Sequence, residues 1–383
     1  MNDIPFTASA TPSLGIELEL QLINLIDGHL SDKSLEIIPL CNDDSHIKKE
    51  LTLSTIELNS SVHDTPFTLY EEINTLARKV AAIAADKQCG LCGGGRHFSN
   101  IWKNQTITPS KRYAELHELQ GFLAKLSCVF GQHIHVGVGS GNDAIYLCHA
   151  LIPYLPHFIA LSASSPYYQS EDTGFDSSRF SALNSFHTFG QIERDIDNWH
   201  KFIGYVEECT ELGVIRSQKD IYWEVRPKPE LGTVEIRVCD TPLTLFHAAM
   251  LGGYAQLLVK YLLKNRVPIA QARNAVTHAN AFHAQRYGFA ALYIDINKHI
   301  RIPLTVHIQD MFSTLENGAN VEEKKVLSYL SSYVQHGVND ASRLREKVQN
   351  GMSELEVISD LMEMLLPTAH ITHSPSSTAK NEA

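Results

Sequence analysis

The sequence predicts a mixed α+β fold, because stretches that alternate like strands and stretches with helical periodicity follow one another along 383 residues. Residues 14–25 alternate strictly between polar and aliphatic side chains, which predicts a half-buried strand. Apolar residues spaced by three and four over 67–88 predict an amphipathic helix. We expect one domain over residues 1–366, because no linker is evident, and a disordered tail over 367–383.

The charge balance and the cysteine count narrow the class of protein. A formal net charge of -11 disfavours binding to nucleic acid or to an anionic membrane, so small molecules and metal ions are the expected partners. No run approaches the roughly 18 apolar residues of a membrane span, and the N-terminal segment lacks a signal-peptide pattern, so we expect a cytoplasmic protein. Seven scattered cysteines suit a reducing compartment, and the isolated Cys89–Cys92 pair disfavours a zinc or redox site.

Acidic side chains mark the first two predicted strands. Glu17 and Glu19 share the polar face of the first strand, where they lie about 7 Å apart. That separation is too large for a hydrogen-bonded acid pair but suits ligands of different ions. Residues 51–59 predict a second strand, which carries Glu57. A solvated polar face would give the same pattern.

Two imidazoles share one face of the strand predicted for residues 131–139. His133 and His135 alternate there with apolar residues, and such a pair suits a metal or phosphate site, although a single histidine is more often structural. The glycine-rich segment 90–97 lacks the residues of a phosphate loop or a dinucleotide fingerprint. A tight turn or a close backbone approach is therefore expected there.

Residues 222–240 predict two short strands around a proline–glycine turn, and each strand carries a Glu-x-Arg pair. Glu235 and Arg237 alternate with valine and isoleucine in the second strand, and Glu224 and Arg226 alternate with apolar residues in the first. Cross-strand ion pairs on an ordinary solvated face would look the same. These two strands alone therefore do not distinguish a functional site from a salt-bridged surface, and the other segments of the chain are needed to decide.

The remaining patterns predict helices and one long loop. Residues 143–164 predict a mostly apolar helix interrupted by two prolines, and the polar stretch that follows and ends at Arg179 predicts a loop of the kind that contacts ligands. Residues 243–263 predict a buried helix. Residues 340–366 predict one charged amphipathic helix.

Grouped by face, the polar side chains of the strands form one constellation. Carboxylates with one or two imidazoles are ligands of Mg²⁺ or Mn²⁺ rather than of zinc. Two such ions would bring about four positive charges, which three or four carboxylates would largely cancel, leaving a field that favours a bound polyphosphate. Arg237 would then face the transferred phosphoryl group, and Arg179 and Arg226 are candidates for binding substrate carboxylates. The constellation consists of Glu17, Glu19, Glu57, His133, His135, Glu235 and Arg237.

Five motifs in a fixed order resemble the carboxylate–amine ligase family, the type 2 glutamate–cysteine ligases. They are GIELEL, IELN, QHIHVG, SASSPxxxxxDTGFxSSR and GTVEIRVCDTPL, and the similarity extends from about Leu14 to Gly288. That family is related to glutamine synthetase. The resemblance therefore implies a curved antiparallel sheet that forms a funnel-shaped active site, with helices packed on its outer face. It also implies ATP and Mg²⁺ or Mn²⁺ as cofactors, and a homodimer.

The resemblance also implies residue roles. His135 and Arg237 would touch the ATP phosphates, Arg179 would bind substrate or phosphate, and Arg237 and Arg179 would be the catalytic arginines. Members of this family more usually have aspartate where this chain has Glu224, which leaves the role of that residue open. The implied metal ligands are Glu17, Glu19, Glu57, His133 and Glu235.

The implied reaction joins the γ-carboxylate of glutamate to the amine of cysteine. ATP first converts the carboxylate to an acyl phosphate, because attack on a carboxylate anion is unfavourable, and the amine then displaces phosphate. No nucleophilic side chain is needed, so no role is predicted for the cysteines. Three alternatives remain: the same chemistry with another amino acid or amine, a metal-dependent hydrolase on the same site, and a non-catalytic metal-binding protein.

Overall fold

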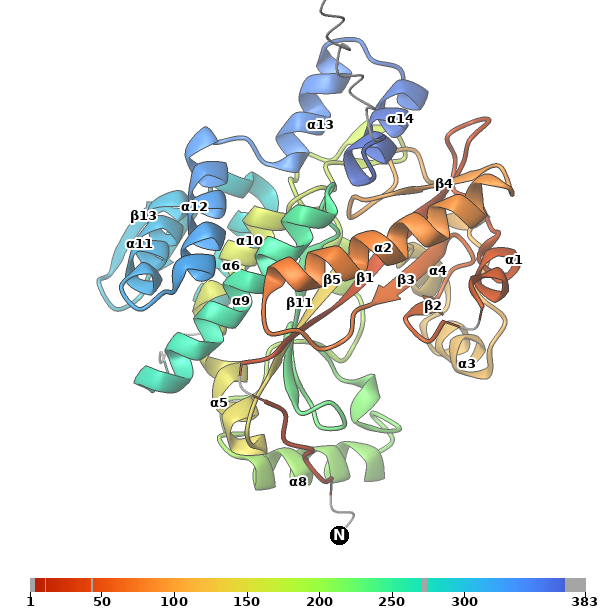
Figure 1. Ribbon diagram of the computed structural model, residues 1–383. Helices are drawn as coiled ribbons and strands as arrows, with labels where there is room; N and C mark the ends of the chain where they lie inside the picture. Colours follow the sequence, from red (N-terminus) through yellow and green to blue (C-terminus); the bar gives the residue numbers. More distant parts are fainter. Residues whose placement is uncertain (1–3, 11, 43, 267, 270–273, 369–383) are drawn as a thin grey trace, which may run out of the picture.

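Seven of the described strands form one sheet at the centre of the molecule (Figure 1). The computed structural model describes residues 4–10, 12–42, 44–266, 268–269 and 274–368. The strand order is β10–β11–β5–β1–β3–β2, each neighbouring pair is antiparallel, and β4 pairs with the C-terminal half of β1. The strands are β1 (Leu14–Asn24), β2 (Ile47–Lys49), β3 (Thr55–Asn59), β4 (Cys89–Cys92), β5 (Gly131–Gly137), β10 (Val225–Lys228) and β11 (Thr233–Asp240).

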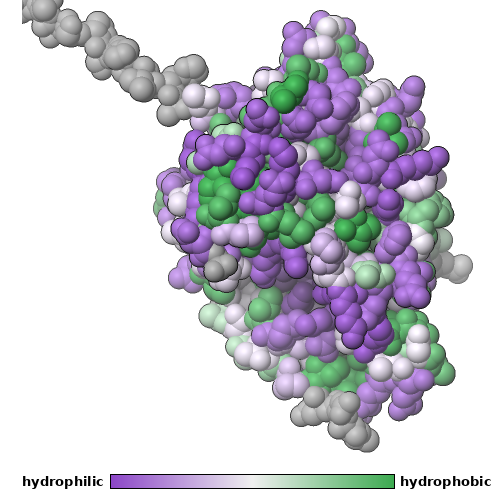
Figure 2. All heavy atoms as spheres, turned by 90° about the vertical axis from the view of Figure 1, so that its right-hand side faces the viewer, coloured by the Kyte–Doolittle hydropathy of each residue, from purple (hydrophilic) through white to green (hydrophobic). Residues whose placement is uncertain are grey.

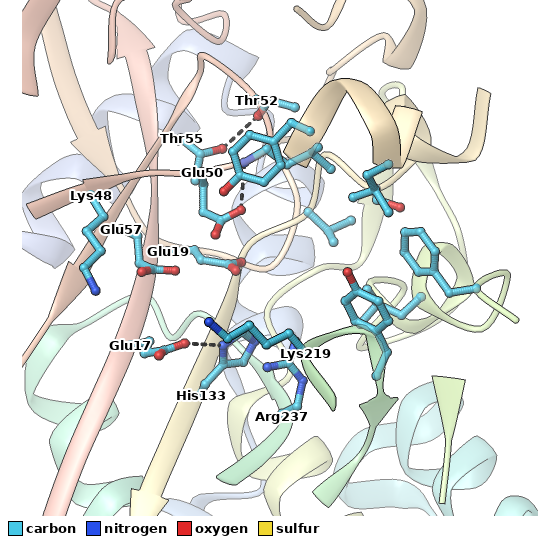
Figure 3. A pocket seen from close by; sticks show the side chains of 18 of the residues that line it. Glu17, Glu19, Lys48, Glu50, Thr52, Thr55, Glu57, His133, Lys219 and Arg237 are labelled. Carbon is cyan, nitrogen blue, oxygen red and sulfur yellow. Dashed lines mark hydrogen bonds and ion pairs between the residues drawn. The ribbon is translucent and has the colours of Figure 1, made fainter. Parts of the chain in front are cut away.

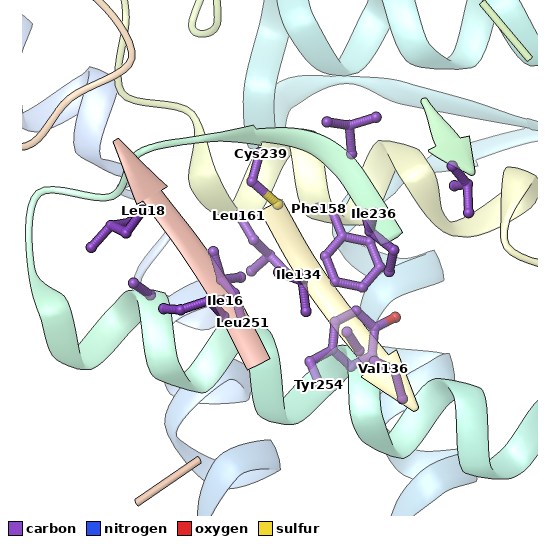
Figure 4. Close-up of a cluster of buried hydrophobic side chains, with 14 of the residues drawn as sticks. Ile16, Leu18, Ile134, Val136, Phe158, Leu161, Ile236, Cys239, Leu251 and Tyr254 are labelled. Atoms are coloured by element: carbon purple, nitrogen blue, oxygen red, sulfur yellow. The ribbon is translucent and has the colours of Figure 1, made fainter. Parts of the chain in front are cut away.

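One face of this sheet packs against helices and forms the main core (Figure 4). Strict alternation along β1 turns Ile16 and Leu18 to this face, where both are buried. The helix α9 (Leu245–Asn265) lies close to the strand, since a Cβ at Gly252 would stand only 3.3 Å from the methyl groups of Leu14. Each fully buried aliphatic side chain contributes about 1.5–3 kcal/mol to the free energy of unfolding. The core therefore fixes the register of the strands that carry the polar residues.

Several helices pack against this face of the central strands. Besides α9, the helices α2 (Pro66–Ala85) and α6 (Leu155–Ser162) contact strands of the sheet. The alternation that buries the aliphatic side chains leaves the polar side chains of β1, β5 and β11 on the opposite face. The predicted α+β class, with an antiparallel sheet and helices packed on one face of it, is confirmed.

The remaining elements surround the sheet. The helices are α1 (Ser34–Ile37), α3 (Lys111–Gln120), α4 (Phe122–Leu126), α5 (Gly141–Ala150), α7 (Phe180–Leu183), α8 (Trp199–Glu211), α10 (Asn274–Tyr287), α11 (Leu304–Glu316), α12 (Val321–His336), α13 (Asp340–Gln349) and α14 (Glu354–Leu365). The short strands are β6 (Tyr167–Tyr168), β7 (Glu171–Asp172), β8 (Phe189–Gly190), β9 (Tyr222–Trp223), β12 (Leu292–Asp295) and β13 (Ile300–Pro303). Figure 1 shows α13 and α14 at one end of the molecule and α8 at the other.

Two predicted elements differ from those observed. The single helix expected over 340–366 is two helices, α13 and α14, because the chain turns at Gly351 with φ of 84° and Ser353 then caps α14 with a capping box. The first strand of the 222–240 hairpin is broken at Glu224, which separates β9 from β10. The predicted interruption near the prolines of 143–164 is present between α5 and α6.

The predicted tail falls almost wholly outside the described residues, which end at Thr368. Among the described helices, no single one is long and apolar enough to cross a membrane, and one bent pair, Gly141–Ala150 with Ile152–Ser162, meets the length and composition test jointly.

Candidate active site

A cleft of about 340 Å³ opens on the polar face of the sheet. Strands β1, β3 and β5 supply its floor, and β2, β10, α3 and the 3₁₀ turn Gln218–Asp220 supply its rim (Figure 3). The surface on the side of α1 and α3 is mostly hydrophilic (Figure 2). The residues that line the cleft include Glu17, Glu19, Lys48, Glu50, Glu57, Arg112, Tyr113, His133, Arg179, Lys219, Arg226, Lys228 and Arg237.

Glu17, His133 and Glu235 form a first group of ligand atoms, here called the histidine cluster. Their ligand atoms lie within 4.8 Å of one another. The register of β1 and β5 places Glu17 opposite His133, and His133 Nδ1 lies 3.0 Å from Glu17 Oε2. Burial opposes ionisation of Glu17, but hydrogen bonding to His133 and its contact with His135 outweigh it and hold the pKa of this carboxyl far below its usual range. Burial, reinforced by the charge of Arg237, lowers the pKa of His133 to about 3.

Glu235 is the fully buried member of the histidine cluster, and basic side chains surround it. Arg226 Nε donates to its Oε2 at 2.7 Å, Arg237 Nη1 donates to its Oε1, and Lys228 Nζ lies 3.8 Å from Oε2. Burial opposes ionisation, yet the charges of Arg226 and Arg237 outweigh it and hold the pKa of Glu235 well below its ordinary value. His133 therefore stands beside a permanently charged and balanced carboxylate.

Glu19, Glu50 and Glu57 form a second group, here called the carboxylate cluster, whose ligand atoms also lie within 4.8 Å of one another. Glu19 and Glu57 are direct cross-strand partners, and Glu50 precedes β3. The Gly131 N–H donates to Glu19 at 2.6 Å and the Leu51 N–H donates to Glu50 at 2.7 Å. Among the described residues, no basic side chain forms an ion pair with these three carboxylates.

The pKa values of the carboxylate cluster are raised, first of all by burial. Burial and the charge of Glu50 raise the pKa of Glu19 to about 7. Burial, followed by the charges of Glu50, Glu17 and Glu19, raises the pKa of Glu57 well above its ordinary value. In their charged forms these carboxylates lack a counter-charge from the described side chains, so the protein alone favours their protonated forms.

The donor sets of both clusters fit divalent cations. The carboxylate cluster offers only oxygen, and the histidine cluster offers two carboxylates and one imidazole, which is the ligand chemistry that Mg²⁺ and Mn²⁺ prefer over zinc. The raised pKa values of Glu19 and Glu57 also suit a cation site, because the charged forms of these carboxylates lack a positive partner that a bound cation would supply.

Arg179 extends from the loop before α7 into the cleft, where it is almost fully buried. Its guanidinium lies against Gly131, at which a Cβ would come within 2.1 Å of Nη2, so the glycine makes the space for it. Nη1 donates to the Arg237 carbonyl at 3.3 Å, and Nε has no hydrogen-bond partner among the described residues. A buried cation with an unused donor is suited to an anionic ligand.

Helix α3 forms one wall of the cleft, although none of its residues is buried. It contributes Arg112 and Tyr113, and burial together with the charges of the carboxylate cluster raises the pKa of the Tyr113 phenol. An ion pair between Glu115 of α3 and Arg216 links the helix to the segment just before the 3₁₀ turn Gln218–Asp220 of the rim. The wall is therefore held mainly by contacts at the surface.

The structure brings eight of the nine predicted site residues to the cleft lining or the two clusters, and it places the ninth, His135, beside them. His135 Nε2 lies 3.4 Å from Glu17 Oε1, and its Nδ1 is 3.1 Å from Thr233 Oγ1. The open question about Glu224 has a structural answer: it is buried outside the cleft lining, where Gln191 donates to it at 2.8 Å and its carbonyl accepts from the Arg237 N–H at 2.9 Å. The catalytic and ligand roles of the predicted residues remain predictions.

Sequence reasoning missed Glu50, Arg112, Tyr113 and the rim lysines. Glu50 lies one residue before the strand predicted for 51–59, so the alternation rule did not assign it to a face. The Lys-Lys-Glu run at 48–50 was the available signal, because β2 pairs Lys48 with Glu57 and thereby turns this edge strand toward the acidic floor.

Clustered ionisable side chains with shifted pKa values, held in a cleft on a rigid sheet, define an enzyme active site. The sequence profile of glutamate–cysteine ligase family 2 matches residues 13–360. A protein of Bordetella avium named "Putative glutamate--cysteine ligase 2" is 42% identical over 349 residues, which cover 90% of this chain and 86% of that protein. A protein of the same name from Janthinobacterium sp. is 38% identical over 364 residues, which cover 93% and 97% of the two chains. The chain therefore belongs to glutamate–cysteine ligase family 2, as the motifs indicated, and it is a ligase.

Two solved structures share the fold. A glutamate–cysteine ligase from Francisella tularensis in complex with AMP has a TM-score of 0.68 at 12% identity, over 95% of this chain and 91% of that chain. A bifunctional glutathione synthetase from Pasteurella multocida has a TM-score of 0.64 at 13% identity, over 92% of this chain and 52% of that chain. At this level of identity, the likeness establishes the common architecture.

Proposed function

We propose that the protein is an ATP-dependent carboxylate–amine ligase that joins the γ-carboxylate of glutamate to an amine, with cysteine as the first amine to test. One observation carries this proposal: two clusters with Mg²⁺-type donor sets lie in one cleft with Arg179 and Arg237. Family membership, the names of the relatives and the AMP in the Francisella tularensis structure support it.

The reaction has two displacements. A γ-carboxylate oxygen of glutamate attacks the terminal phosphorus of ATP, the bond to ADP breaks, and an acyl phosphate forms. The amine nitrogen then attacks the acyl carbon, the bond to phosphate breaks, and the nitrogen loses a proton. Divalent cations in the two clusters would neutralise phosphate charge as it develops. No covalent bond to the protein is required.

The protein's own residues bind and orient the anionic groups. Arg237 reaches the cleft from β11 while its Nη1 is held by Glu235, so its remaining donors can face the transferred phosphoryl group. Arg179 offers a buried cation with an unused Nε. Lys48 and Lys219 stand at the rim and form no ion pair with another described residue, so they favour entry of anionic substrates.

The proposal has finer parts, of which the homodimer rests on the family resemblance alone. The cation is Mg²⁺ or Mn²⁺, residues 1–366 act as one catalytic domain, and the enzyme is a homodimer in the cytoplasm. Size-exclusion chromatography with light scattering would measure the oligomeric state, and a monomer would contradict the homodimer.

A coupled assay of ADP release tests the reaction. The protein is incubated with ATP, Mg²⁺ and glutamate, with and without cysteine, and the amide product is identified by mass spectrometry. Release of ADP that depends on the amine supports the ligase, and product formed without ATP overturns it. A Glu235→Gln preparation purified in parallel measures contaminating ATPase activity. A screen of amino acids and amines in the same assay then identifies the acceptor, and water as the effective acceptor would indicate a hydrolase instead.

A further inference from the structure

A buried carboxylate at the end of β11 holds together segments that lie behind the cleft. Asp240 is fully buried and accepts three hydrogen bonds from serine residues. Its Oδ2 accepts from the Ser164 N–H at 3.0 Å and from the Ser165 hydroxyl at 2.7 Å, and its Oδ1 accepts from the Ser177 hydroxyl at 2.8 Å. Three donors on one carboxylate satisfy it well enough to stay buried.

These serines lead directly to Arg179. The Ser165 hydroxyl donates to Asp240 and accepts from the Arg179 N–H at 3.2 Å, so it stands between the carboxylate and the arginine backbone. The Ser178 N–H donates to the Ser165 carbonyl at 3.1 Å, and Ser177 is bound to Asp240 through its side chain. The backbone on the N-terminal side of Arg179 is therefore fixed at consecutive residues.

Two glycines make room for this arrangement. A Cβ at Gly95 would lie 2.5 Å from Asp240 Cγ, so the carboxylate packs directly on the glycine-rich segment 90–97. A Cβ at Gly131 would likewise collide with the guanidinium of Arg179. The close backbone approach expected for the glycine-rich segment is thus made toward Asp240 at Gly95.

Asp240 also contributes to the charge balance of Arg179. Among the described residues, no carboxylate forms an ion pair with the Arg179 guanidinium, although this side chain is buried. Burial lowers the pKa of Arg179, and the negative charges of Glu19 and Asp240 partly oppose that change. Glu19 belongs to the carboxylate cluster, so Asp240 is the anion that stays with Arg179 when a cation occupies that cluster.

We propose that Asp240 is a positioning residue that fixes the place and the charge balance of Arg179 through Ser165 and Ser177, so that the guanidinium meets an anionic group of the substrates. This inference rests on the proposed function, in which Arg179 binds such a group. Asp240 itself is not among the residues that line the cleft.

A double-mutant cycle in kcat/KM tests the inference in the full-length protein. Asp240→Asn keeps the size of the side chain and can keep its hydrogen bonds, because the Ser177 hydroxyl can rotate to accept, but it removes the charge. We expect Asp240→Asn to lower kcat/KM about 10–100-fold, Arg179→Ala to lower it at least as much, and the double variant to lie within about threefold of Arg179→Ala. A residue that only stabilises the fold would instead give losses that multiply.

The matched control is Asp340→Asn. Asp340 is a buried carboxylate that accepts from the Leu243 N–H at 3.1 Å and from the Tyr333 hydroxyl at 3.2 Å, and it has no contact with Arg179. We expect the kcat/KM of this variant to change less than about threefold. Equal kinetic losses for the two Asp→Asn variants, or multiplying losses in the cycle, overturn the inference and leave the proposed ligase function standing.

A crystal structure of Asp240→Asn gives a readout that does not depend on activity. If the wild-type protein shows no ATP-dependent ligation, the proposed function fails, and the position of the Arg179 guanidinium still decides the inference. Displacement from Gly131 by about 1 Å or more supports it, since a shift of that size is enough to cost about a hundredfold in rate. An unchanged position overturns it.

Discussion

The histidine cluster and the carboxylate cluster are neighbours on the same sheet, yet the protein balances their charges differently. Glu235 of the histidine cluster is bonded by Arg226 and Arg237, and its pKa is well below the ordinary value. The carboxylates of the second cluster receive backbone hydrogen bonds but no ion pair from described side chains, and the pKa of Glu57 is well above the ordinary value.

This difference concerns how the negative charge of each cluster is balanced by the protein's own side chains. In the histidine cluster, the positive charges of Arg226 and Arg237 balance Glu235, which in turn binds Arg237. The carboxylate cluster carries a charge that the described side chains leave unbalanced, and on the proposed function a divalent cation balances it. Substitution of a carboxylate should therefore have opposite effects on the stability of the metal-free protein in the two clusters.

The largest effect is expected from breaking the ion pair of the histidine cluster. Glu235→Gln and Arg237→Ala should each lower kcat/KM by about a thousandfold or more. Glu235→Gln removes a proposed metal ligand and the carboxylate that binds Arg237, and Arg237→Ala removes the positive charge that faces the transferred phosphoryl group. Steady-state ADP release measures the loss. Glu72→Gln, in an ion pair with His63 outside the cleft, is the control and should keep full activity. Turnover retained by either cluster variant would exclude β11 from the site.

Substitution in the carboxylate cluster should separate metal binding from stability. Because the folded-state pKa of Glu57 is raised, its contribution to stability is present below the unfolded value of about 4.5 and is lost as pH rises through the folded value. Glu57→Gln should therefore stabilise the metal-free protein at pH 8, by about 1–3 kcal/mol, while Glu235→Gln should destabilise it. The same Glu57→Gln variant should need at least about tenfold more Mn²⁺ for half-maximal activity.

Thermal unfolding with and without Mn²⁺ measures both parts of that prediction. Glu224→Gln is the matched control, because burial raises the pKa of Glu224 to about 7 although it lies outside both clusters. It should gain stability at pH 8 without losing the rise in Tm that Mn²⁺ gives the wild type. If Glu57→Gln responds to Mn²⁺ as this control does, the carboxylate cluster is not a metal site.

A smaller effect is expected from a buried histidine pair that lies apart from both clusters. His157 Nε2 is 2.7 Å from His307 Nδ1, and burial lowers the pKa of His307 to about 4. Below about pH 6.5 the unfolded state therefore binds a proton that the folded state does not bind. The free energy of unfolding consequently falls as the pH drops from 6.5 to 4. His307→Gln should reduce the slope of the free energy of unfolding against pH in that window by the contribution of one titrating group, up to roughly 1.4 kcal/mol per pH unit. The plot of Tm against pH should flatten accordingly. A profile parallel to that of the wild type would contradict this.

The smallest effect is expected at the edge of the histidine cluster. Lys228 Nζ lies 3.8 Å from Glu235 and its side chain is partly exposed, so water can replace much of its contribution. Lys228→Ala should lower kcat/KM only about two- to fivefold, measured in the same assay. A loss as large as that of Arg237→Ala would show that the arginines alone do not balance Glu235.

Alternation in the strands was enough to predict much of the fold and most of the site. Glu17, Glu19, His133 and Glu235 each stand at an alternating position of a strand, and the period-2 rule assigns such residues to a face without further information. The antiparallel register then brings them together. The motif order added the family, which alternation alone does not give.

The residues that sequence reasoning missed lie where no period applies. Glu50 precedes a strand, and Tyr113 belongs to a helix that turns to the cleft only through tertiary packing. The break at Glu224 also has a tertiary cause, since Gln191 binds its side chain and β8 pairs with β9 there. Long-range contacts of this kind cannot be read from local patterns.

Helix α3 has a consequence for exchange between the site and solvent. A helix that buries none of its residues can open by local unfolding at a lower free energy than the sheet beneath it. Its amide protons should therefore exchange with deuterated water well before those of β1 and β5, even while the core stays closed. Tyr113 and Arg112 would leave and rejoin the active site with each opening, which gives substrates a route in without disturbing the strands that hold the two clusters.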